Sequence, residues 1–116
     1  MARKCTALIN LSAIKENYLY AKSLAPNSKA IAIIKADAYG HGAVEVAKEL
    51  SEVADAYGVA CIEEAIELIN SGIDNTPILL LEGVFEKSEL ILAEKHNLIV
   101  TAVSYTHLTL PTNREV

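Results

Sequence analysis

Four short apolar runs, of which the first three are each followed by a segment with helical spacing, constrain the fold of this chain more than any other feature. They begin near residues 30, 56, 78 and 98, so they recur about every 20 to 26 residues. The runs are Ala30–Ile34, Ala56–Cys61, Ile78–Leu81 and Leu98–Val103. Strands that alternate with helices form parallel sheets, because a crossover helix returns the chain to the same edge. The sequence therefore predicts an α/β fold, and the continuous apolar runs predict strands that are buried on both faces.

The segments around these runs predict the helices. A helix that begins at Ala43 follows the first run, and Ile62–Asn70 and Ser88–His96 supply the next two. Upstream, Ser12 is expected to cap a further helix, and Ala7–Ile9 is a short strand candidate before it. The apolar face of the helix after the first run is formed by Ala43, Val46, Ala47 and Leu50.

Two architectures accommodate this pattern: an open, doubly wound sheet and a (β/α)8 barrel. The chain has 116 residues, whereas a whole barrel needs about 250. The barrel reading therefore predicts a partial TIM (β/α)8 barrel, with about three strand-helix units plus a fourth strand. An open barrel would leave residues 98–103 as an unpaired apolar edge, which favours aggregation.

The last thirteen residues differ from the rest of the chain, because their apolar residues do not recur with the spacing of a helix. Residues 104–116 are rich in threonine and contain no alanine or glycine. We expect residues 1–103 to form the N-terminal part of a barrel domain, and 104–116 to be a non-native or disordered tail resembling a translated sequencing adaptor. An ordinary loop or edge strand is the alternative.

Composition narrows the class of protein. The chain is 52% hydrophobic and 22% charged, with a formal net charge of −5, and its charges of both signs are interspersed. This is typical of a soluble globular protein and offers no basic stripe for nucleic acid or for an anionic membrane. Cys5 and Cys61 lack metal-binding or CxxC spacing, as in proteins of a reducing compartment. With no signal peptide or apolar span of about 18 residues, we expect a cytoplasmic protein.

A single lysine, Lys35, directly follows the first apolar run. Side chains alternate along a strand, so Lys35 is expected to continue the row of Ile31 and Ile33, which we predict to face the core. Active sites of parallel sheets and barrels lie at the carboxyl ends of strands. Burial there favours the neutral amine, which Schiff-base chemistry requires. Position alone leaves open a lysine that extends into solvent.

The residues near Lys35 could bind a ligand or serve the local structure, and their spacing alone does not decide between these roles. Gly40 and Gly42 allow a tight turn before a helix N-terminus, where unpaired amides favour a phosphate. Tyr39 could donate its hydroxyl to that phosphate or pack over the end of the sheet. His41 is interpreted as a hydrogen-bonded structural residue, and the pair Glu63–Glu64 as a helix cap.

The stretch from Ala32 to Ala43, which reads AIIKADAYGHGA, closely resembles the pyridoxal-phosphate attachment motif of alanine racemases. The motif is long and specific. Residues 11–17 (LSAIKEN) are similar to the opening segment of that family, and residues 60–68 (ACIEEAIEL) to its second strand-helix junction. The resemblance covers about residues 2 to 103.

This resemblance implies a fold-type III pyridoxal-phosphate enzyme, with an N-terminal barrel and a second, mostly β domain. Lys35 would be the catalytic and cofactor-binding residue, holding pyridoxal 5'-phosphate in a Schiff base and acting as base on the D-alanine side. Tyr39 would bind the cofactor phosphate. The base on the L side would be a tyrosine from the partner subunit of a homodimer, and no residue here matches it or the arginine facing the pyridine nitrogen.

The resemblance therefore predicts an N-terminal fragment, inactive by itself, of an isomerase that interconverts L-alanine and D-alanine and supplies D-alanine for cell-wall peptidoglycan. Two alternatives share the cofactor motif. One is a single-domain pyridoxal-phosphate-binding homeostasis protein without racemase activity. The other is a racemase for serine or another amino acid. No metal, nucleic-acid or membrane partner is expected.

Overall fold

The computed structural model describes residues 3–102, which form a four-stranded parallel sheet with its strands in the order β1-β2-β3-β4. The strands are β1 (Ile31–Ile33), β2 (Ala56–Val59), β3 (Ile78–Leu80) and β4 (Ile99–Val100). Each is a shortened version of a predicted apolar run. The α/β class and the three strand-helix units with a fourth strand are thereby confirmed. The predicted tail at 104–116 lies outside the described residues and stays a prediction, which the gene sequence beyond the codon for Val103 can check.

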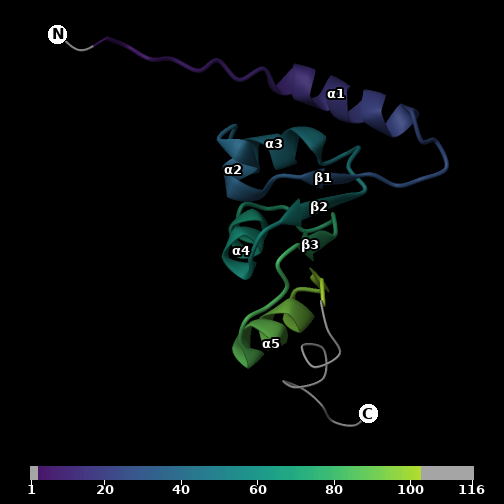
Figure 1. Ribbon diagram of the computed structural model, residues 1–116, viewed down its shortest axis with the longest axis vertical. Helices are drawn as coiled ribbons and strands as arrows, with labels where there is room; N and C mark the ends of the chain where they lie inside the picture. The colour runs from purple at the N-terminus through teal and green to yellow at the C-terminus, as the bar shows by residue number, and fades with distance from the viewer. Residues whose placement is uncertain (1–2, 103–116) are drawn as a thin grey trace.

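The helices connect successive strands and lie along one side of the sheet (Figure 1). After the N-terminal α1 (Leu11–Ser23) and the short α2 (Lys35–Tyr39), these are α3 (Ala43–Leu50), α4 (Ile62–Asn70) and α5 (Lys87–Lys95). A sheet whose strands are in sequence order, joined by right-handed crossovers, has all its helices on one face. The four-stranded sheet is not closed, since β1 and β4 do not pair.

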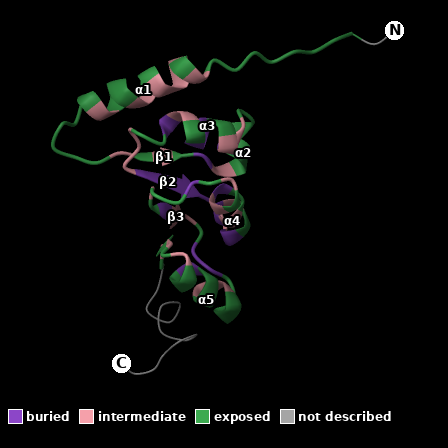
Figure 2. Cartoon of the chain, turned by 180° about the vertical axis from the view of Figure 1, so that it is seen from behind, coloured by how far each residue is buried: buried purple, intermediate pink, exposed green. Residues whose placement is uncertain are grey.

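The core lies between the sheet and these helices. All four predicted apolar residues of α3, from Ala43 to Leu50, are buried, as are Ile62, Ala65 and Leu68 of α4 (Figure 2). In the strand register, Ala32 pairs with Tyr57 and Tyr57 with Ile78, so this row faces the helices. Tyr57 and Leu80 are 0% exposed.

The opposite face of the sheet is open in the described part of the chain. One row of the register contains Ile33, Gly58, Leu79 and Ile99. Ile33 is 40% exposed and Ile99 is 47% exposed. The prediction that the strands are buried on both faces is therefore wrong for β1 and β4 in the described range, whereas every residue of β2, between its two neighbours, is buried.

The N-terminal segment corrects two further expectations. Residues 7–9 form no strand, because no described strand lies beside them to pair with. The cap of α1 is Asn10 rather than Ser12: the Asn10 side chain accepts a hydrogen bond from the Ala13 N–H at 3.0 Å, which leaves Ser12 inside the first turn.

Helix α1 is fixed to the sheet at the amino ends of β1 and β2. The Tyr18 hydroxyl donates to the Ala30 carbonyl at 2.8 Å and accepts from the Asp55 N–H at 3.0 Å. The Asp55 carboxylate accepts from the Ala30 N–H at 2.8 Å and pairs with Lys22 at 3.1 Å. These two contacts lower the pKa of Asp55. The network lies at the end of the sheet opposite to Lys35.

The buried hydroxyl of Tyr57 donates to the Ala47 carbonyl at 2.5 Å, and burial raises the pKa of Tyr57 from 10.0 to about 12. The unfolded chain then ionises at a lower pH than the folded one, so stability is complete below pH 10 and is lost as pH rises toward 12. We expect a decline of up to about 1.4 kcal/mol per pH unit in this window. The measurement is denaturant unfolding of the full-length protein from pH 9 to pH 12. Tyr57→Phe, which lacks this group, should decline less steeply, and equal slopes would contradict the prediction.

Candidate functional site

Lys35 lies just beyond the carboxyl end of β1, as predicted, and begins α2. The prediction that it continues a core-facing row is wrong for the described chain. Ile31 and Ile33, the alternate residues before it, are 45% and 40% exposed, whereas Ile34 is 3% exposed and faces the helices. Lys35 itself is half-buried. The row that leads to it therefore lines the open face of the sheet, the side on which a barrel has its interior.

The segment after Lys35 has an unusual backbone. Ala36, Asp37, Ala38 and Tyr39 have φ angles between 52° and 56°, so the turn called α2 is left-handed. For residues with a Cβ atom this conformation costs roughly 1–2 kcal/mol each. The sequence predicted only a glycine-rich turn at Gly40 and Gly42, because alanine, aspartate and tyrosine give no signal for left-handed geometry.

Hydrogen bonds hold this left-handed turn at both ends. At its exit, the Gly42 N–H donates to the Asp37 carbonyl at 2.9 Å, and the Ala43 N–H donates to the Asp37 carboxylate at 2.8 Å. The Asp37 side chain thereby connects the turn to the first residue of α3. His41 is the structural residue that the sequence predicted: its Nδ1 lies 2.9 Å from the Ala38 carbonyl oxygen.

Tyr39 ends the turn and is 62% exposed. The alternative in which Tyr39 packs over the end of the sheet is therefore wrong for the described chain. Neither the Tyr39 hydroxyl nor the Lys35 amine makes a hydrogen bond or an ion pair with any residue from 3 to 102. Both polar groups lie on one short turn and are available to a ligand.

The entrance to the turn is held by a residue whose role the sequence did not predict. The Glu64 carboxylate accepts hydrogen bonds from the Ala36 N–H at 2.8 Å and from the Ala60 N–H at 2.6 Å. The interpretation of Glu63–Glu64 as a helix cap is thus incomplete. Glu64 reaches back to the start of α4 as a capping glutamate does, and it also reaches across to the residue after Lys35. No local pattern in the sequence signals the second contact, because Ala36 and Glu64 are brought together only by strand pairing.

Cys61, at the N-cap of α4, lies at the same end of the sheet. Burial raises the pKa of its thiol, and the neighbouring glutamates Glu63 and Glu64 add to this effect by their charges. The thiol is therefore held in its protonated form, whereas a nucleophilic cysteine reacts as the thiolate.

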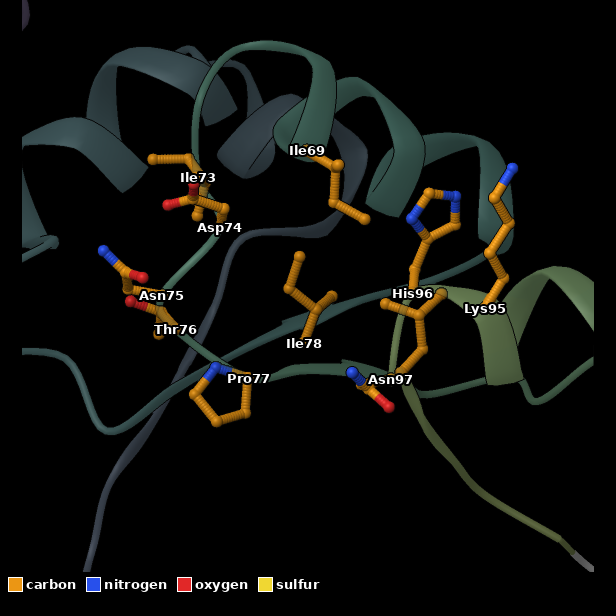
Figure 3. Close-up of a pocket in the computed structure, with 11 residues that line it drawn as sticks. Ile69, Ile73, Asp74, Asn75, Thr76, Pro77, Ile78, Lys95, His96 and Asn97 are labelled. Carbon is orange, nitrogen blue, oxygen red and sulfur yellow. The ribbon is translucent and has the colours of Figure 1, made fainter.

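A pocket of about 340 Å³ lies at the opposite end of the strands (Figure 3). Its walls are residues 73–78, which lead into β3, and residues 95–98, which lead into β4, together with Ile69. Parallel sheets place their chemistry at the carboxyl ends of strands, so this pocket is at the wrong end for an active site. In residues 3–102, no three histidine, cysteine, aspartate or glutamate side chains cluster as a metal site would require, and no helix is long and apolar enough to cross a membrane.

Comparison with known proteins agrees with this geometry. The model of the family described as "Alanine racemase, N-terminal domain" matches residues 9–113. The alanine racemase of Chromohalobacter salexigens is 51% identical over 98 residues, which are 84% of this chain and 27% of that protein. The chain therefore spans about a quarter of the length of the curated relatives it matches.

Solved structures show the same relationship. The biosynthetic alanine racemase of Pseudomonas aeruginosa superimposes with a TM-score of 0.80 at 45% identity, over 85% of this chain and 27% of that one. An alanine racemase from Bartonella henselae, solved with covalently bound pyridoxal phosphate, superimposes with a TM-score of 0.69 at 34% identity, over 75% of this chain and 26% of that one. The four-stranded open sheet thus corresponds to part of the barrel in these enzymes. The chain belongs to the alanine racemase family, of which it carries the first part of the N-terminal domain.

Proposed function

We propose that the protein containing this chain is a pyridoxal-phosphate-dependent racemase that interconverts L-alanine and D-alanine, with Lys35 as its catalytic, cofactor-binding residue. The left-handed turn is the observation that carries the proposal. Consecutive non-glycine residues in a costly conformation persist only where surrounding contacts impose them, and such strain concentrates at functional sites. The strained turn carries the Lys35 amine and the Tyr39 hydroxyl, and it lies at the carboxyl end of the strands, where active sites of parallel sheets lie.

The residues present fit pyridoxal phosphate. The half-buried Lys35 amine makes no polar contact within residues 3–102, so it can form a covalent Schiff base with an aldehyde. Tyr39, exposed four residues later, can donate its hydroxyl to a phosphate oxygen. When bound, the cofactor supplies an electron sink for the electron pair left at the substrate α-carbon.

In this mechanism Lys35 has two roles: it would hold the cofactor, and it would serve as one of the two bases. The Lys35 amine, when it is free, would take or return the substrate α-proton on the D-alanine side. The left-handed turn fixes the direction from which it approaches. A racemase needs a second base on the opposite face, and we propose that a partner subunit of a homodimer supplies it. By itself, the 116-residue chain is then inactive.

The cellular role follows from the reaction. D-Alanine made by a cytoplasmic racemase supplies the synthesis of cell-wall peptidoglycan, and we propose this role for the full-length protein. A substrate panel on that protein, with alanine and serine as the first two amino acids, distinguishes an alanine racemase from a racemase of another specificity. Absence of racemisation with every amino acid, together with cofactor binding, would instead identify a binding protein.

Trapping of the cofactor tests the assignment of Lys35. Sodium borohydride should reduce the Schiff base in the full-length protein loaded with pyridoxal phosphate and leave a stable adduct. Peptide mass mapping should then find the adduct on the peptide that contains Lys35, at close to one per subunit. The other lysines of the chain are the internal control, since several of them, such as Lys48, are more exposed to the reagent than Lys35. An adduct on any of them in place of Lys35 would overturn the proposal.

A further inference from the structure

The Glu64 carboxylate lies between the carboxyl ends of two neighbouring strands. Its Oε2 accepts from the N–H of Ala36, which directly follows Lys35, at 2.8 Å. Its Oε1 accepts from the N–H of Ala60, which directly follows β2, at 2.6 Å. A charged acceptor makes each of these hydrogen bonds stronger than one between neutral groups. One side chain therefore connects the backbone at Lys35 to the adjacent strand.

A second glutamate in the chain shows which of these two contacts is exceptional. Glu89 occupies the equivalent position in the first turn of α5 and accepts from the Phe85 N–H at 2.8 Å. The backward contact to the residue before the N-cap thus recurs in two strand-helix units, as a structural cap would. The contact from Glu64 to Ala36 has no counterpart at Glu89 within residues 3–102. It is the feature that is specific to the lysine-bearing strand.

The contact to Ala36 fixes the orientation of Lys35. The Ala36 N–H belongs to the peptide bond that joins Lys35 to Ala36, so holding it fixes the plane in which the Lys35 carbonyl lies. Ala36 is also the first of the left-handed residues. Without a partner for this N–H, the strained turn could relax and the direction of the Lys35 side chain would change.

We propose that Glu64 is a positioning residue for the cofactor lysine: by holding the Ala36 N–H against the end of β2, it aims the Lys35 amine at the reacting carbon. This inference rests on the function proposed above for Lys35. It gives Glu64 no direct role in proton transfer. Because a displacement of about 1 Å can slow an oriented reaction by about 100-fold, loss of this contact is expected to affect turnover more than substrate binding.

The test compares three variants of the full-length, cofactor-loaded protein. In Glu64→Gln one acceptor oxygen becomes an NH₂ group, so one of the two backbone N–H groups loses its partner and the side chain no longer bridges Ala36 and Ala60. Glu64→Asp keeps the charge but is too short to reach both. Glu89→Gln makes the same change at the matched cap in α5, where the remaining oxygen still serves the single contact to the Phe85 N–H, and it leaves the turn at Lys35 intact. The measurements are KM for alanine and kcat, the latter divided by the fraction of subunits trapped at Lys35 by borohydride.

We expect kcat per trapped subunit to fall about 10- to 100-fold in Glu64→Gln, with KM changed less than about threefold, and to change less than about twofold in Glu89→Gln. Equal effects of the two glutamine variants would mean that Glu64 is only a cap, and would overturn the proposal. If Glu64→Gln does not fold, Glu64→Asp decides in the same way. Amide hydrogen exchange of the wild-type protein needs no variant: a slow Ala36 amide supports the contact, and a freely exchanging one overturns it. Wild-type protein with no adduct at Lys35 would instead refute the proposed function.

Discussion

Replacing Lys35 with alanine should reduce racemisation by the full-length protein about 1000-fold or more. The change removes the amine that would hold the cofactor covalently and, in the same atom, the base on the D-alanine side. General acid-base catalysis alone contributes typically 10²- to 10⁴-fold, and covalent attachment adds to this. The measurement is the rate at which the optical activity of D-alanine or L-alanine is lost, at saturating substrate and cofactor.

A matched lysine variant separates loss of chemistry from loss of fold. Lys48 is exposed in the last turn of α3, so Lys48→Ala removes the same side chain from a position outside the site. We expect Lys48→Ala to keep activity within about twofold of wild type, since exposed substitutions change stability by less than about 0.5 kcal/mol. Both variants should unfold at similar denaturant concentrations. Lys35→Ala with more than a tenth of wild-type activity would show that another residue carries the reaction.

The sequence was sufficient to predict the sheet because its apolar runs and helical faces have different periods. The four buried residues of α3, from Ala43 to Leu50, were predicted from spacing alone, and α4 has the predicted bounds Ile62–Asn70. Such patterns are local, and packing against the sheet agrees with them. Strand lengths were overestimated because an apolar run continues past the last paired residue; at Ala60 and Cys61, for example, the chain already turns into α4.

The candidate site was predicted less completely, for two physical reasons. The position of Lys35 at a strand end followed from the pattern, and its proposed role from the family resemblance. The left-handed turn did not follow, because Ala36, Ala38 and Tyr39 have no preference for positive φ and the turn depends on hydrogen bonds made by Asp37 and Glu64. The open face at Ile31 and Ile33 was also missed, since an apolar row looks the same whether or not another part of a barrel covers it.

The contact between Glu64 and Ala36 illustrates the general difficulty. The two residues are separated by 28 positions, and their distance is set by the pairing of β1 with β2. In the sequence, Glu64 is a carboxylate in the first turn of a helix, where negative charge is favourable. This local role is enough to explain why a glutamate stands at that position. A residue that satisfies a local role gives no indication of a second role across the sheet. The register that brings the two strand ends together therefore matters for the site as much as Lys35 does.

Tyr57 is fully buried in β2, the strand that pairs with both β1 and β3, and its replacement by alanine should produce a large loss of stability. Tyr57 is 0% exposed, pairs with Ala32 and Ile78 in the sheet, and donates its hydroxyl to Ala47 of α3. Truncation of a buried aromatic residue to alanine costs about 3–5 kcal/mol, because a cavity remains where the ring was. We expect a decrease of this size in the free energy of unfolding of the full-length protein, measured by denaturant titration at pH 8.

Two further variants divide this loss into its parts. Tyr57→Phe keeps the ring and removes only the hydrogen bond to Ala47, so it should cost about 0.5–1.5 kcal/mol. Tyr20→Ala makes the same truncation at a tyrosine of α1 that is 67% exposed, and it should change the free energy of unfolding by less than about 0.5 kcal/mol. Equal losses in Tyr57→Ala and Tyr20→Ala would show that the core does not lie between β2 and α3. A large loss at Tyr57 alone would show that packing of β2 against α3 stabilises the fold. The same strand supports the candidate site, because Ala60, which donates to Glu64, lies one residue beyond its end.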